Sequence, residues 1–510
     1  MKRVSIPSRW ATTRLVRPRA LVVLPLFLTG CMVGPDYTKP TAPTPTAYKE
    51  AGDWKQAEPK DDAIRGKWWE VYGDPRLNQL EEQVDISNQN VLQAEAQFRE
   101  AASAVKVARA GLFPSVTANP SYTESQESQN LTSHSNAAGV QHQGAETQGV
   151  YDLPLEATYL ADVWGAVRRQ VEANSTSAQA SFAELENARL SYQATLAQDY
   201  FSLGGLDAEE QILNTTVASY RKYLDLTTNR YNSGIASKGD VALAQTQLDT
   251  ARAQLIDLGV DRAQYEHAIA TLTGKPASDF SLEKVPLAGT PPRIPVAMPS
   301  VLLERRPDIA AAERQVASAN ASIGVAVAAY YPSITLSGST GLEAIKLSEL
   351  FSGPSFLWSV GPALAQTLFD AGKIHGQVQE AQANYDAMVA AYRETVLTAF
   401  QQVEDDLSGL RILADEAQAQ ADAVDSAKKS LDIATNQYQA GTSDYLTVIT
   451  AQTTELNDEL NSVSIRMRRM TTSVLLIEAV GGGWNASVVP TAHEVSNEPQ
   501  AVKQIEKEKK

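Results

Sequence analysis

An internal repeat limits the possible folds of this chain more than any other feature. Arg230-Tyr231-Asn232-Ser233-Gly234 stands 207 positions before Gln437-Tyr438-Gln439-Ala440-Gly441, and the same offset aligns Gly274 with Gly481. Upstream, at a slightly larger offset, Phe113-Pro114-Ser115 matches Tyr331-Pro332-Ser333. Shared Gly, Pro and Tyr landmarks in one register predict two copies of a single structural unit.

Each copy predicts the same order of elements: a helix, two strands, a very long helix, a turn and a return helix. The first helices run from about 88 to 112 and from about 308 to 330, with apolar residues at helical spacing. Phe113-Pro114 and Tyr331-Pro332 end them, because a residue before proline is pushed out of the helical region.

Strand patterns follow each first helix. They cover 115–123 and 150–160 in the first copy, and 333–342 and 358–368 in the second. Alternation of apolar residues and lengths of about ten residues suit tilted membrane strands, and the polar stretch 124–148 suits an external loop. Pro154 and Pro362 predict distorted or edge positions. Aromatic residues bracket the strands, as at a membrane interface: Phe113, Tyr159, Trp164, Tyr331, Phe356, Trp358 and Phe369.

The long helices run from about 168 to 231 and from about 377 to 438. At 1.5 Å per residue each is roughly 95 Å long, which no compact domain holds. After Gly234 and Gly441 the chain reverses into shorter helices, at about 240–272 and 445–479. A first helix and a return helix together nearly equal one long helix. We therefore expect them to stack end to end beside it, giving four helices per chain at every level.

The N-terminus reads as an export signal. A basic segment precedes an apolar run that is too short to span a membrane, and the run ends at Leu28-Thr29-Gly30-Cys31. This resembles a bacterial lipobox, which implies that Cys31 is lipidated and becomes the mature N-terminus. Met32 after the cysteine resembles lipoproteins sent to the outer membrane. The following Pro-rich residues predict an extended tether, and the last twenty or so residues are expected to be disordered.

These features divide the chain into six expected segments. They are a signal peptide (1–30), a tether and equatorial segment (31–87), the first repeat (88–274), an equatorial linker (275–307), the second repeat (308–481) and a C-terminal tail (482–510).

Strand number predicts an assembly. No segment after the signal reads as a transmembrane helix, so any spanning part has to consist of strands closed into a barrel. Four strands per chain cannot close one, and an open edge does not sit in lipid. Two chains give about eight strands and a plugged interior, whereas three give twelve and a lumen. We expect a homotrimer.

Composition excludes several classes of function. The formal net charge of -16 provides no basic footprint for a nucleic acid. A single cysteine and five histidines without ligand spacing predict no metal site and no disulfide framework. We find no nucleophile elbow, phosphate loop or dinucleotide fingerprint, so the sequence predicts neither an enzyme nor a cofactor.

Four landmarks now resemble the TolC-like outer-membrane efflux proteins, in the OprM-like lipoprotein branch that serves resistance-nodulation-division (RND) pumps. They are the start Cys31-Met32-Val33-Gly34-Pro35-Asp36-Tyr37, the central Leu302-Leu303-Glu304-Arg305-Arg306-Pro307-Asp308-Ile309, the paired Tyr-x-x-Gly turns, and Phe369-Asp370-Ala371-Gly372. The resemblance covers nearly the whole mature chain. It implies a trimeric twelve-stranded β-barrel in the outer membrane, continued by a twelve-helix α-barrel across the periplasm.

The resemblance further implies an exit duct for drugs or other small toxic compounds, closed at rest and opened when a periplasmic adaptor and an inner-membrane RND pump dock. The turns would be the tips that adaptor hairpins contact: Gly234, Ile235, Ala236, Ser237, Gly441, Thr442 and Ser443. Gly234 and Gly441 also read as plain helix C-caps, which is compatible with a tip.

A closed tip needs groups that face inward. A ring of three carboxylates repels itself and binds cations, so it can constrict a pore. Asp240 and Asp444 are candidates for this ring, and both also read as ordinary helix starts, Asp240 as an N-cap. Arg230, Tyr231 and Tyr438 are the other expected aperture residues, with Arg230 and Tyr231 placed to lock one chain to its neighbour. Related channels carry acids where this chain has Thr447 and Thr450, so the ring assignment stays open.

Alternative functions remain. Within the same class, the chain would be a channel for metal-ion efflux or for type I protein secretion. In another class, it would be a lipidated periplasmic adaptor or scaffold, which should lack two strand hairpins placed symmetrically in a repeat.

Overall fold

The computed structural model describes residues 32–51, 66–126, 147–294 and 299–496. These residues form two compact units. One contains a β-sheet and draws on residues 32–34, 111–169 and 324–374; the other is helical and contains the remaining described residues. Because each unit takes segments from both halves of the sequence, this division cuts across the repeat.

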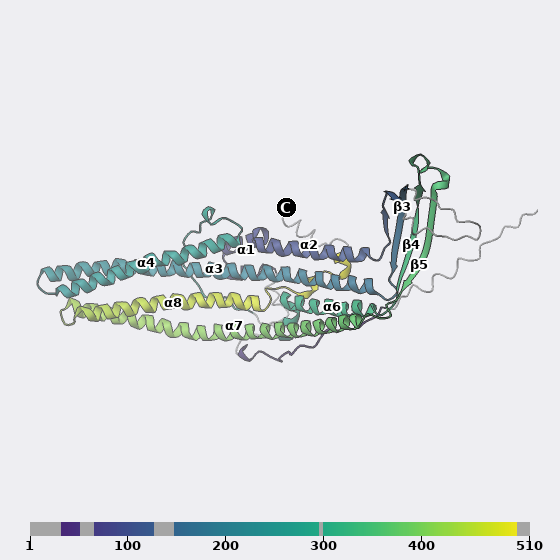
Figure 1. Cartoon of the computed structure of the whole chain (residues 1–510). Helices are drawn as coiled ribbons and strands as arrows, with labels where there is room; N and C mark the ends of the chain where they lie inside the picture. Colours follow the sequence, from purple (N-terminus) through teal and green to yellow (C-terminus); the bar gives the residue numbers. More distant parts are fainter. Residues whose placement is uncertain (1–31, 52–65, 127–146, 295–298, 497–510) are drawn as a thin grey trace, which may run out of the picture. The chain divides into compact units, whose positions relative to one another are not determined.

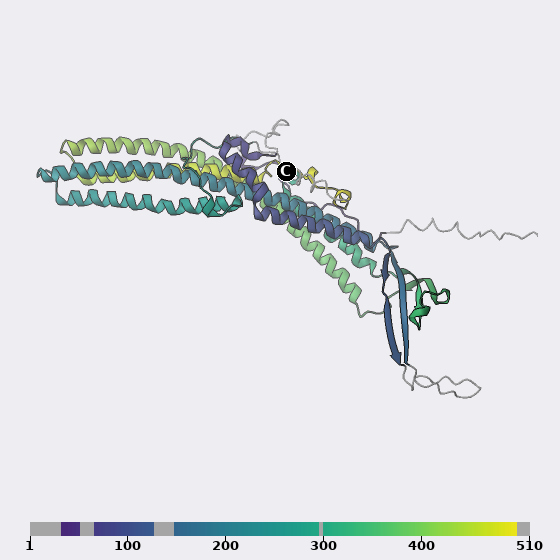
Figure 2. The same ribbon diagram turned by 90° about the horizontal axis from the view of Figure 1, so that it is seen from above.

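The helices of the helical unit confirm the predicted order. Helix α1 (Pro75–Ser87) leads into α2 (Gln89–Ala110), and α3 (Ala166–Asn232) turns back into α4 (Lys238–Leu272). The second copy consists of α6 (Pro307–Ala328), α7 (Lys373–Gln439) and α8 (Tyr445–Ala479). Figures 1 and 2 show α4 and α2 along α3, and α8 and α6 along α7. No helix of the described ranges is both long and apolar enough to cross a membrane.

The repeat is preserved to the residue. Helices α3 and α7 both have 67 residues, α4 and α8 both have 35, and all four bounds differ by the same 207 positions. Helices α2 and α6 both have 22 residues, and their bounds differ by 218. The two copies therefore hold equivalent residues at equivalent places, which allows any feature of one to be compared with the other.

The expected end-to-end stacking is present in both copies. At the first joint, Asn88 donates its side-chain amide to the last carbonyl of α4, Leu272 O (3.0 Å), and accepts from Asn90 N and Val91 N at the start of α2. At the second joint, Arg306 donates to Ala479 O at the end of α8 (3.0 Å) and pairs with Asp308 at the start of α6. Asn88 and Arg306 stand at equivalent positions, so different chemistry satisfies the same free helix end.

Each joint brings two backbones together at a glycine. A Cβ on Gly274 would lie 2.4 Å from Ser87 O, and one on Gly481 would lie 2.0 Å from Arg305 O. Both glycines also have positive φ, 71° and 93°. A side chain at either position is therefore excluded by space as well as by backbone conformation.

Two carboxylates lie beside the second joint, and they predict a pH dependence of stability. Burial raises the pKa of Asp406 to about 7, with Asp405 and Glu478 adding to the rise and Arg306 opposing it. Burial also raises the pKa of Glu478. The folded chain thus prefers both acids protonated. The stability that protonated Asp406 provides is lost as the pH rises from about 4 to about 7, and the raised pKa of Glu478 changes stability in the same direction.

Asp406→Asn is accordingly expected to flatten this dependence and to raise the melting temperature at pH 8. Thermal unfolding followed by circular dichroism between pH 5 and pH 8 measures the effect. Asp415→Asn removes the same charge from an exposed position on α7 that is not among the groups shifting the pKa of Asp406, and it serves as the control. Equal slopes for wild type and Asp406→Asn would contradict the assignment.

The sheet has the order β1-β3-β4-β5, with β2 also paired to β3. Its strands are β1 (Ser115–Ala118), β2 (Ser121–Gln126), β3 (Thr147–Ala161), β4 (Ser333–Ala344) and β5 (Phe356–Ala365). All pairs are antiparallel, which confirms both predicted hairpins and joins them through β3 and β4. The last strand ends at Ala365 rather than at 368, and most of the expected loop, 127–146, lies outside the described residues.

The register places the apolar residues on one face of the sheet. Leu155 pairs with Thr340 and Thr340 with Trp358, while Leu153 pairs with Leu342 and Leu342 with Phe356. Residues of the opposite parity are mostly Ser, Thr and Gly, as in the row Glu156, Ser339 and Ser359. The apolar face is exposed in the single chain, with Val360 at 76% and Trp358 at 67%.

The two strand prolines have different settings. Pro362 lies in β5, an edge strand of this sheet, as predicted. Pro154 lies at the other predicted kind of position, a distorted one: it is in β3, between β1–β2 and β4. The sheet tolerates it because β1 and β2 are one strand interrupted at Asn119-Pro120, opposite Leu153 and Pro154. Two residues without a backbone N–H thus meet where the ladder is already broken.

The predicted tether is extended but not loose. We call residues 32–51 the N-terminal strap. In the sheet unit, Arg169 donates to Val33 O (3.2 Å), and Gly34 packs against Gly324 so closely that a Cβ would lie 2.4 Å from the Gly324 Cα.

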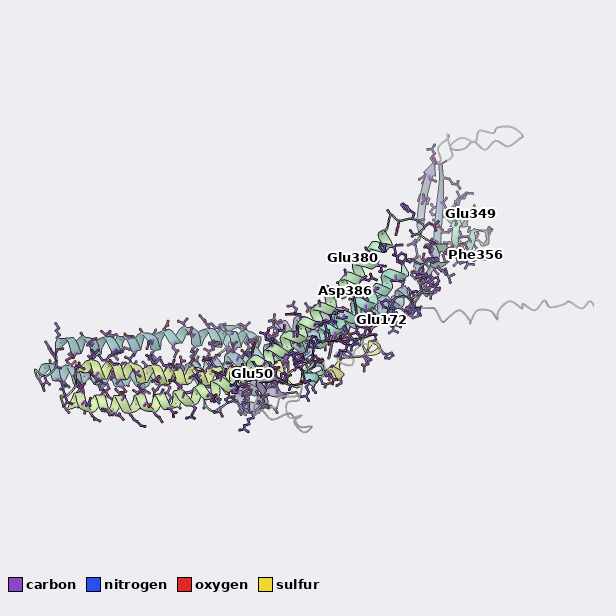
Figure 3. The ribbon with its side chains drawn as sticks, turned by 90° about the horizontal axis from the view of Figure 1, so that it is seen from below. Glu50, Glu172, Glu349, Phe356, Glu380 and Asp386 are labelled. Atoms are coloured by element: carbon purple, nitrogen blue, oxygen red, sulfur yellow. The ribbon has the colours of Figure 1, made fainter. Side chains whose placement is uncertain are left out.

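In the helical unit, the N-terminal strap runs along α6 and α7. Asn320 binds Pro35 O (3.0 Å), and Arg393 binds Thr41 O (3.1 Å). Glu404 accepts from the backbone of Lys49 and Glu50, and Arg411 pairs with Glu50 at 2.7 Å. Figure 3 shows Glu50 against the helices. The sequence missed these contacts because proline content indicates extension and not attachment.

The C-terminal prediction of disorder is wrong for its first part. Helix α9 (Ala492–Ser496) packs on α2, with Val495 buried against Ala102, Val105 and Ala178. Gln179 further binds Pro490 O at 2.8 Å. Residues 497–510 lie outside the described residues.

Candidate functional site

The candidate site consists of the two helix turns, 233–237 between α3 and α4 and 440–444 between α7 and α8. Gly234 and Gly441 have φ values of 73° and 79°. Ile235 N donates to Arg230 O and Thr442 N to Gln437 O, both at 2.9 Å. Each long helix therefore ends in the same glycine-based cap. The left-handed glycine turns the chain so that the next backbone N–H can donate to a free carbonyl at the end of the helix.

The two return helices begin with exchanged chemistry. Ser237 is the N-cap of α4, and its hydroxyl accepts from Asp240 N while the Asp240 carboxylate accepts from Ser237 N (2.9 Å). At the equivalent positions, Asp444 is the N-cap of α8, and it accepts from the backbone and hydroxyl of Thr447 (3.1 and 2.7 Å). Asp240 is thus the third residue of its helix and not its N-cap, and Thr447 takes the place of an acid.

The Asp444 carboxylate is exposed and stays charged. Hydrogen bonds from Thr447, first its hydroxyl and then its backbone, lower the pKa of Asp444 below the usual value. The acid therefore carries a full negative charge at every physiological pH. Within this single chain it has no cation as a partner among the ion pairs of the described residues.

Arg230 joins the first turn to the second within one chain. Its guanidinium lies 4.6 Å from the centroid of the Tyr438 ring and donates to Gln439 O (3.2 Å), a carbonyl at the end of α7. Tyr438 is buried and packs against Tyr445 with ring centroids 5.2 Å apart. The sequence predicted Arg230 as a link between chains. It could not predict this contact within one chain, because hydrophobic periodicity does not show which residues of α3 and α7 meet.

A shared apolar core holds the two turns together. It contains residues of α4, α7 and α8, namely Ala244, Ala434, Tyr438, Tyr445, Val448, Ile449 and Ala451. Partly buried residues of α3 (Tyr223, Leu224 and Leu226) and of α7 (Leu431) pack against it. Outside this core, Ile235 is 66% exposed and Tyr231 is 43% exposed. The first turn and the end of α3 thus present exposed apolar side chains beside this core, whereas Gly441 and Thr442 are exposed in the second turn.

The remaining expected site residues lie as follows. Ala236 and Ser443 are half-buried, and Gly234, Ser237, Gly441 and Thr442 are exposed. Cys31 lies outside the described residues. No group of three or more His, Cys, Asp or Glu side chains that could hold a metal occurs in the ranges the structure describes.

Comparison with known proteins adds an independent line. The sequence matches the family described as outer membrane efflux protein over residues 80–275 and 298–482. It is 30% identical over 475 residues to the probable efflux pump outer membrane protein TtgC of Pseudomonas putida, covering 91% of this chain and 95% of that protein. It is also 30% identical over 482 residues to nodulation protein T of Rhizobium leguminosarum bv. viciae, covering 94% and 96%.

Solved structures agree. The outer-membrane channel OprN superposes with a TM-score of 0.81 at 28% identity, covering 89% of this chain and all of that one. The CmeC outer membrane channel of Campylobacter jejuni gives 0.82 at 22% identity, covering 94% and 98%, which shows the fold alone. The matched family, TtgC, OprN and CmeC are described as efflux components or outer-membrane channels, not as enzymes.

Proposed function

This chain belongs to the outer membrane efflux protein family, and from that membership we propose that it is the outer-membrane exit duct of a tripartite RND-type pump that exports drugs or other small toxic compounds. One observation supports this most directly. A sheet with an exposed apolar face and two helix pairs ending in capped tips occur in one chain, in duplicate. An exposed apolar sheet face suits a membrane and capped helix tips suit an aqueous compartment, so the two together favour a protein that extends from one into the other.

The sheet is the proposed membrane part. Lipid offers no hydrogen bonds, so a spanning sheet has to be closed and its outer face has to be apolar. The described sheet has one such face but two open edges. Three chains would close it as a twelve-stranded barrel, and the four helices that each chain provides at every level would form a twelve-helix barrel in the periplasm.

The N-terminus is the proposed anchor. In this proposal residues 1–30 are a signal peptide and Cys31 carries the lipid, so the channel is anchored to the outer membrane and extends into the periplasm. The clamped position of Met32 to Gly34 supports this: Val33 N donates to Trp164 O (3.1 Å), and Trp164 stacks on Tyr331. An interface-type aromatic pair thus lies beside the first mature residues. The segments 31–87, 88–274, 275–307, 308–481 and 482–510 remain the proposed division of the mature chain.

The two turns are the proposed aperture and adaptor contact. Gly234 to Ser237 and Gly441 to Ser443 would meet the hairpins of a periplasmic membrane-fusion adaptor, with Ile235 as the most exposed apolar group. Asp240, Asp444, Arg230, Tyr231 and Tyr438 would form the closed aperture. The contact of Arg230 with Tyr438 and Gln439 supports a role in holding the two helix pairs together.

The Asp444 charge is expected to restrict the closed pore. Asp444→Ala removes the charge and the helix cap, whereas Asp444→Asn removes only the charge, because asparagine is an equally good N-cap. If three charged carboxylates constrict the tip, both variants should conduct ions several-fold better than wild type in planar bilayers. An increase for Asp444→Ala alone would assign the effect to helix fraying, and unchanged conductance in both would remove Asp444 from the aperture.

Cargo class decides between the proposal and its alternatives. A deletion strain should become more susceptible to several unrelated antibiotics, dyes and solvents, and expression of the chain in trans should restore resistance. Hypersensitivity limited to copper or silver salts would favour a metal-ion efflux channel, and loss of one secreted protein would favour type I secretion. A periplasmic adaptor or scaffold would be recovered without detergent, in contrast to the heat-modifiable trimer that the proposal expects.

A further inference from the structure

The sheet has two unpaired edges, and the repeat indicates how they meet. Within the described residues the edges are β1–β2 on one side and β5 on the other. Inside the chain, the two hairpins are already joined by β3 and β4. In a closed ring of hairpins, β5 of one chain would contact β1–β2 of the next as β3 contacts β4 within a chain. This inference rests on the trimer in the proposed function.

The repeat makes this correspondence numerical. Ser115 pairs with Thr158 in the first hairpin, and Ser333 pairs with Ala365 in the second. Strand β4 thus corresponds to β1 at an offset of 218, and β5 corresponds to β3 at an offset of 207, the same two offsets that relate the helices. Any β3–β4 pair can therefore be converted into the equivalent pair between β5 and a neighbouring β1–β2.

We propose that β5 of one chain joins β1–β2 of a second copy of this chain in one defined register, with Ser359 opposite Ser125 and Val360 opposite Glu124. The first pair corresponds to Asp152 and Glu343, and the second to Leu153 and Leu342. The same conversion sets Pro362 opposite Tyr122, from the pair Leu155 and Thr340. The seam then extends over residues 358–365 and 119–126.

Strand direction agrees with this seam. Successive strands alternate in direction, because all pairs are antiparallel. With four strand positions per chain, β5 runs opposite to β1 and β2. The next copy therefore meets it in the antiparallel sense that all the other junctions have.

The two faces agree as well. Val360, Pro362 and Leu364 lie on the apolar face of β5. On the other edge, Tyr122 shares a face with Tyr151, and Val116 shares a face with Ala157. The proposed register brings Tyr122 opposite Pro362, so the apolar residues of the two edges lie on the same face, which also carries Glu124 opposite Val360. A shift of one residue would turn the neighbour's polar face toward the apolar side.

Shifts of two residues would preserve the faces and need a separate argument. With such a shift, the residue register between hairpins of neighbouring chains would differ from the register between β3 and β4 within a chain. The strict equality of helix lengths in the two copies argues against this, since β1 and β4 begin at equivalent residues, as do α3 and α7, and both hairpins pair in the same register. A proposed trimer has three β3–β4 junctions within chains and three seams between chains. The duplicated geometry favours the same register at all of them.

Cysteine pairs test the register directly. Directly opposed residues have Cβ atoms about 4.5–5.5 Å apart and diagonal ones about 7–8 Å, and a disulfide needs close to 4 Å. The pairs Ser125→Cys with Ser359→Cys and Glu124→Cys with Val360→Cys should form disulfide-linked dimers and trimers on non-reducing gels. Two pairs are used because neighbouring pairs in an antiparallel ladder alternate between wide and narrow spacing.

Offset pairs are the matched controls. Thr123→Cys with Ser359→Cys tests a two-residue shift in one direction, and Thr123→Cys with Ala363→Cys tests the other. Ser339→Cys with Ser359→Cys, opposed within one chain, verifies the oxidation step by closing without linking chains. Because Cys31 is the only native cysteine, each single-cysteine variant reports any background link.

The outcomes separate the two proposals. Linked trimers from the matched pairs and little from the offset pairs support the register. Preferential linkage of an offset pair overturns the register while the trimer stands. Absence of any link between chains overturns the seam, and a native mass of one chain in detergent would overturn the trimer itself.

Discussion

Gly481→Ala is expected to prevent stable folding of the second helix joint. The new Cβ would lie 2.0 Å from Arg305 O, a backbone atom that no rotamer change can move, and the residue has φ of 93°. The left-handed conformation alone costs about 1–2 kcal/mol for a residue with a side chain. Relief of the backbone overlap adds about 1–3 kcal/mol. We expect a melting temperature lowered by several degrees and little trimer in the outer membrane.

Gly441→Ala is the control, because it shares the backbone conformation without the overlap. Its φ is 79°, and a Cβ added there would meet nothing within 4 Å. It should lose only the conformational part, about 1–2 kcal/mol. Gly274→Ala, at the equivalent first joint, should behave like Gly481→Ala. If Gly441→Ala and Gly481→Ala are equally stable, close packing at the joint does not matter to folding.

Arg306→Gln is expected to have the second-largest effect. Arg306 is 8% exposed, donates to Ala479 O and forms two hydrogen bonds with Asp308 (3.0 and 2.7 Å). Its loss leaves a helix end unsatisfied and removes the cation that opposes the raised pKa of Asp406. Breaking a buried pair from one side costs about 3 kcal/mol or more.

The pH dependence of this loss identifies its cause. Without Arg306, the pKa values of Asp406 and Glu478 should rise further, because both feel its positive charge. The variant should therefore be closest to wild type near pH 5 and most destabilised near pH 8. Arg468→Gln, which breaks an exposed 3.6 Å pair with Glu416, is the matched control and should cost under about 1 kcal/mol at either pH. A loss for Arg306→Gln that does not vary with pH would assign the effect to the helix end alone.

Local signals explain what the sequence could predict. Pro114 and Pro332 ended the first helices, Gly234 and Gly441 marked the turns, and alternation identified the hairpins. Each of these features depends on residues a few positions apart. The repeat then extended these local predictions to the whole chain. Because the same elements occur twice in one order, the lengths of the helices could be compared, and the comparison predicted that the shorter helices stack end to end.

Contacts between distant residues explain what it could not. Arg306 was recognised as part of a landmark, but its bond to Ala479 O spans 173 positions and no pattern indicates it. The same holds for the pinning of Glu50 by Arg411, for Val495 on α2, and for Arg230 over Tyr438. The sequence could not choose between a distorted and an edge position for Pro154, because the interruption opposite it lies on another strand. These contacts depend on how elements far apart in the sequence pack against each other, which is known only once the fold is known.

The two copies differ in length at one place, where the offset falls from 218 at α6 to 207 at α7, across the connection within each hairpin. In a ring of parallel long helices, one residue added to a helix would move its tip by about 1.5 Å relative to the other tips. A docking partner that contacts all the tips at once would then fit less well. The connection within a hairpin does not have to match the length of its counterpart in this way. An epitope tag inserted there should be tolerated, whereas the same tag in any long helix should abolish export, and natural variation in length should concentrate at the same point.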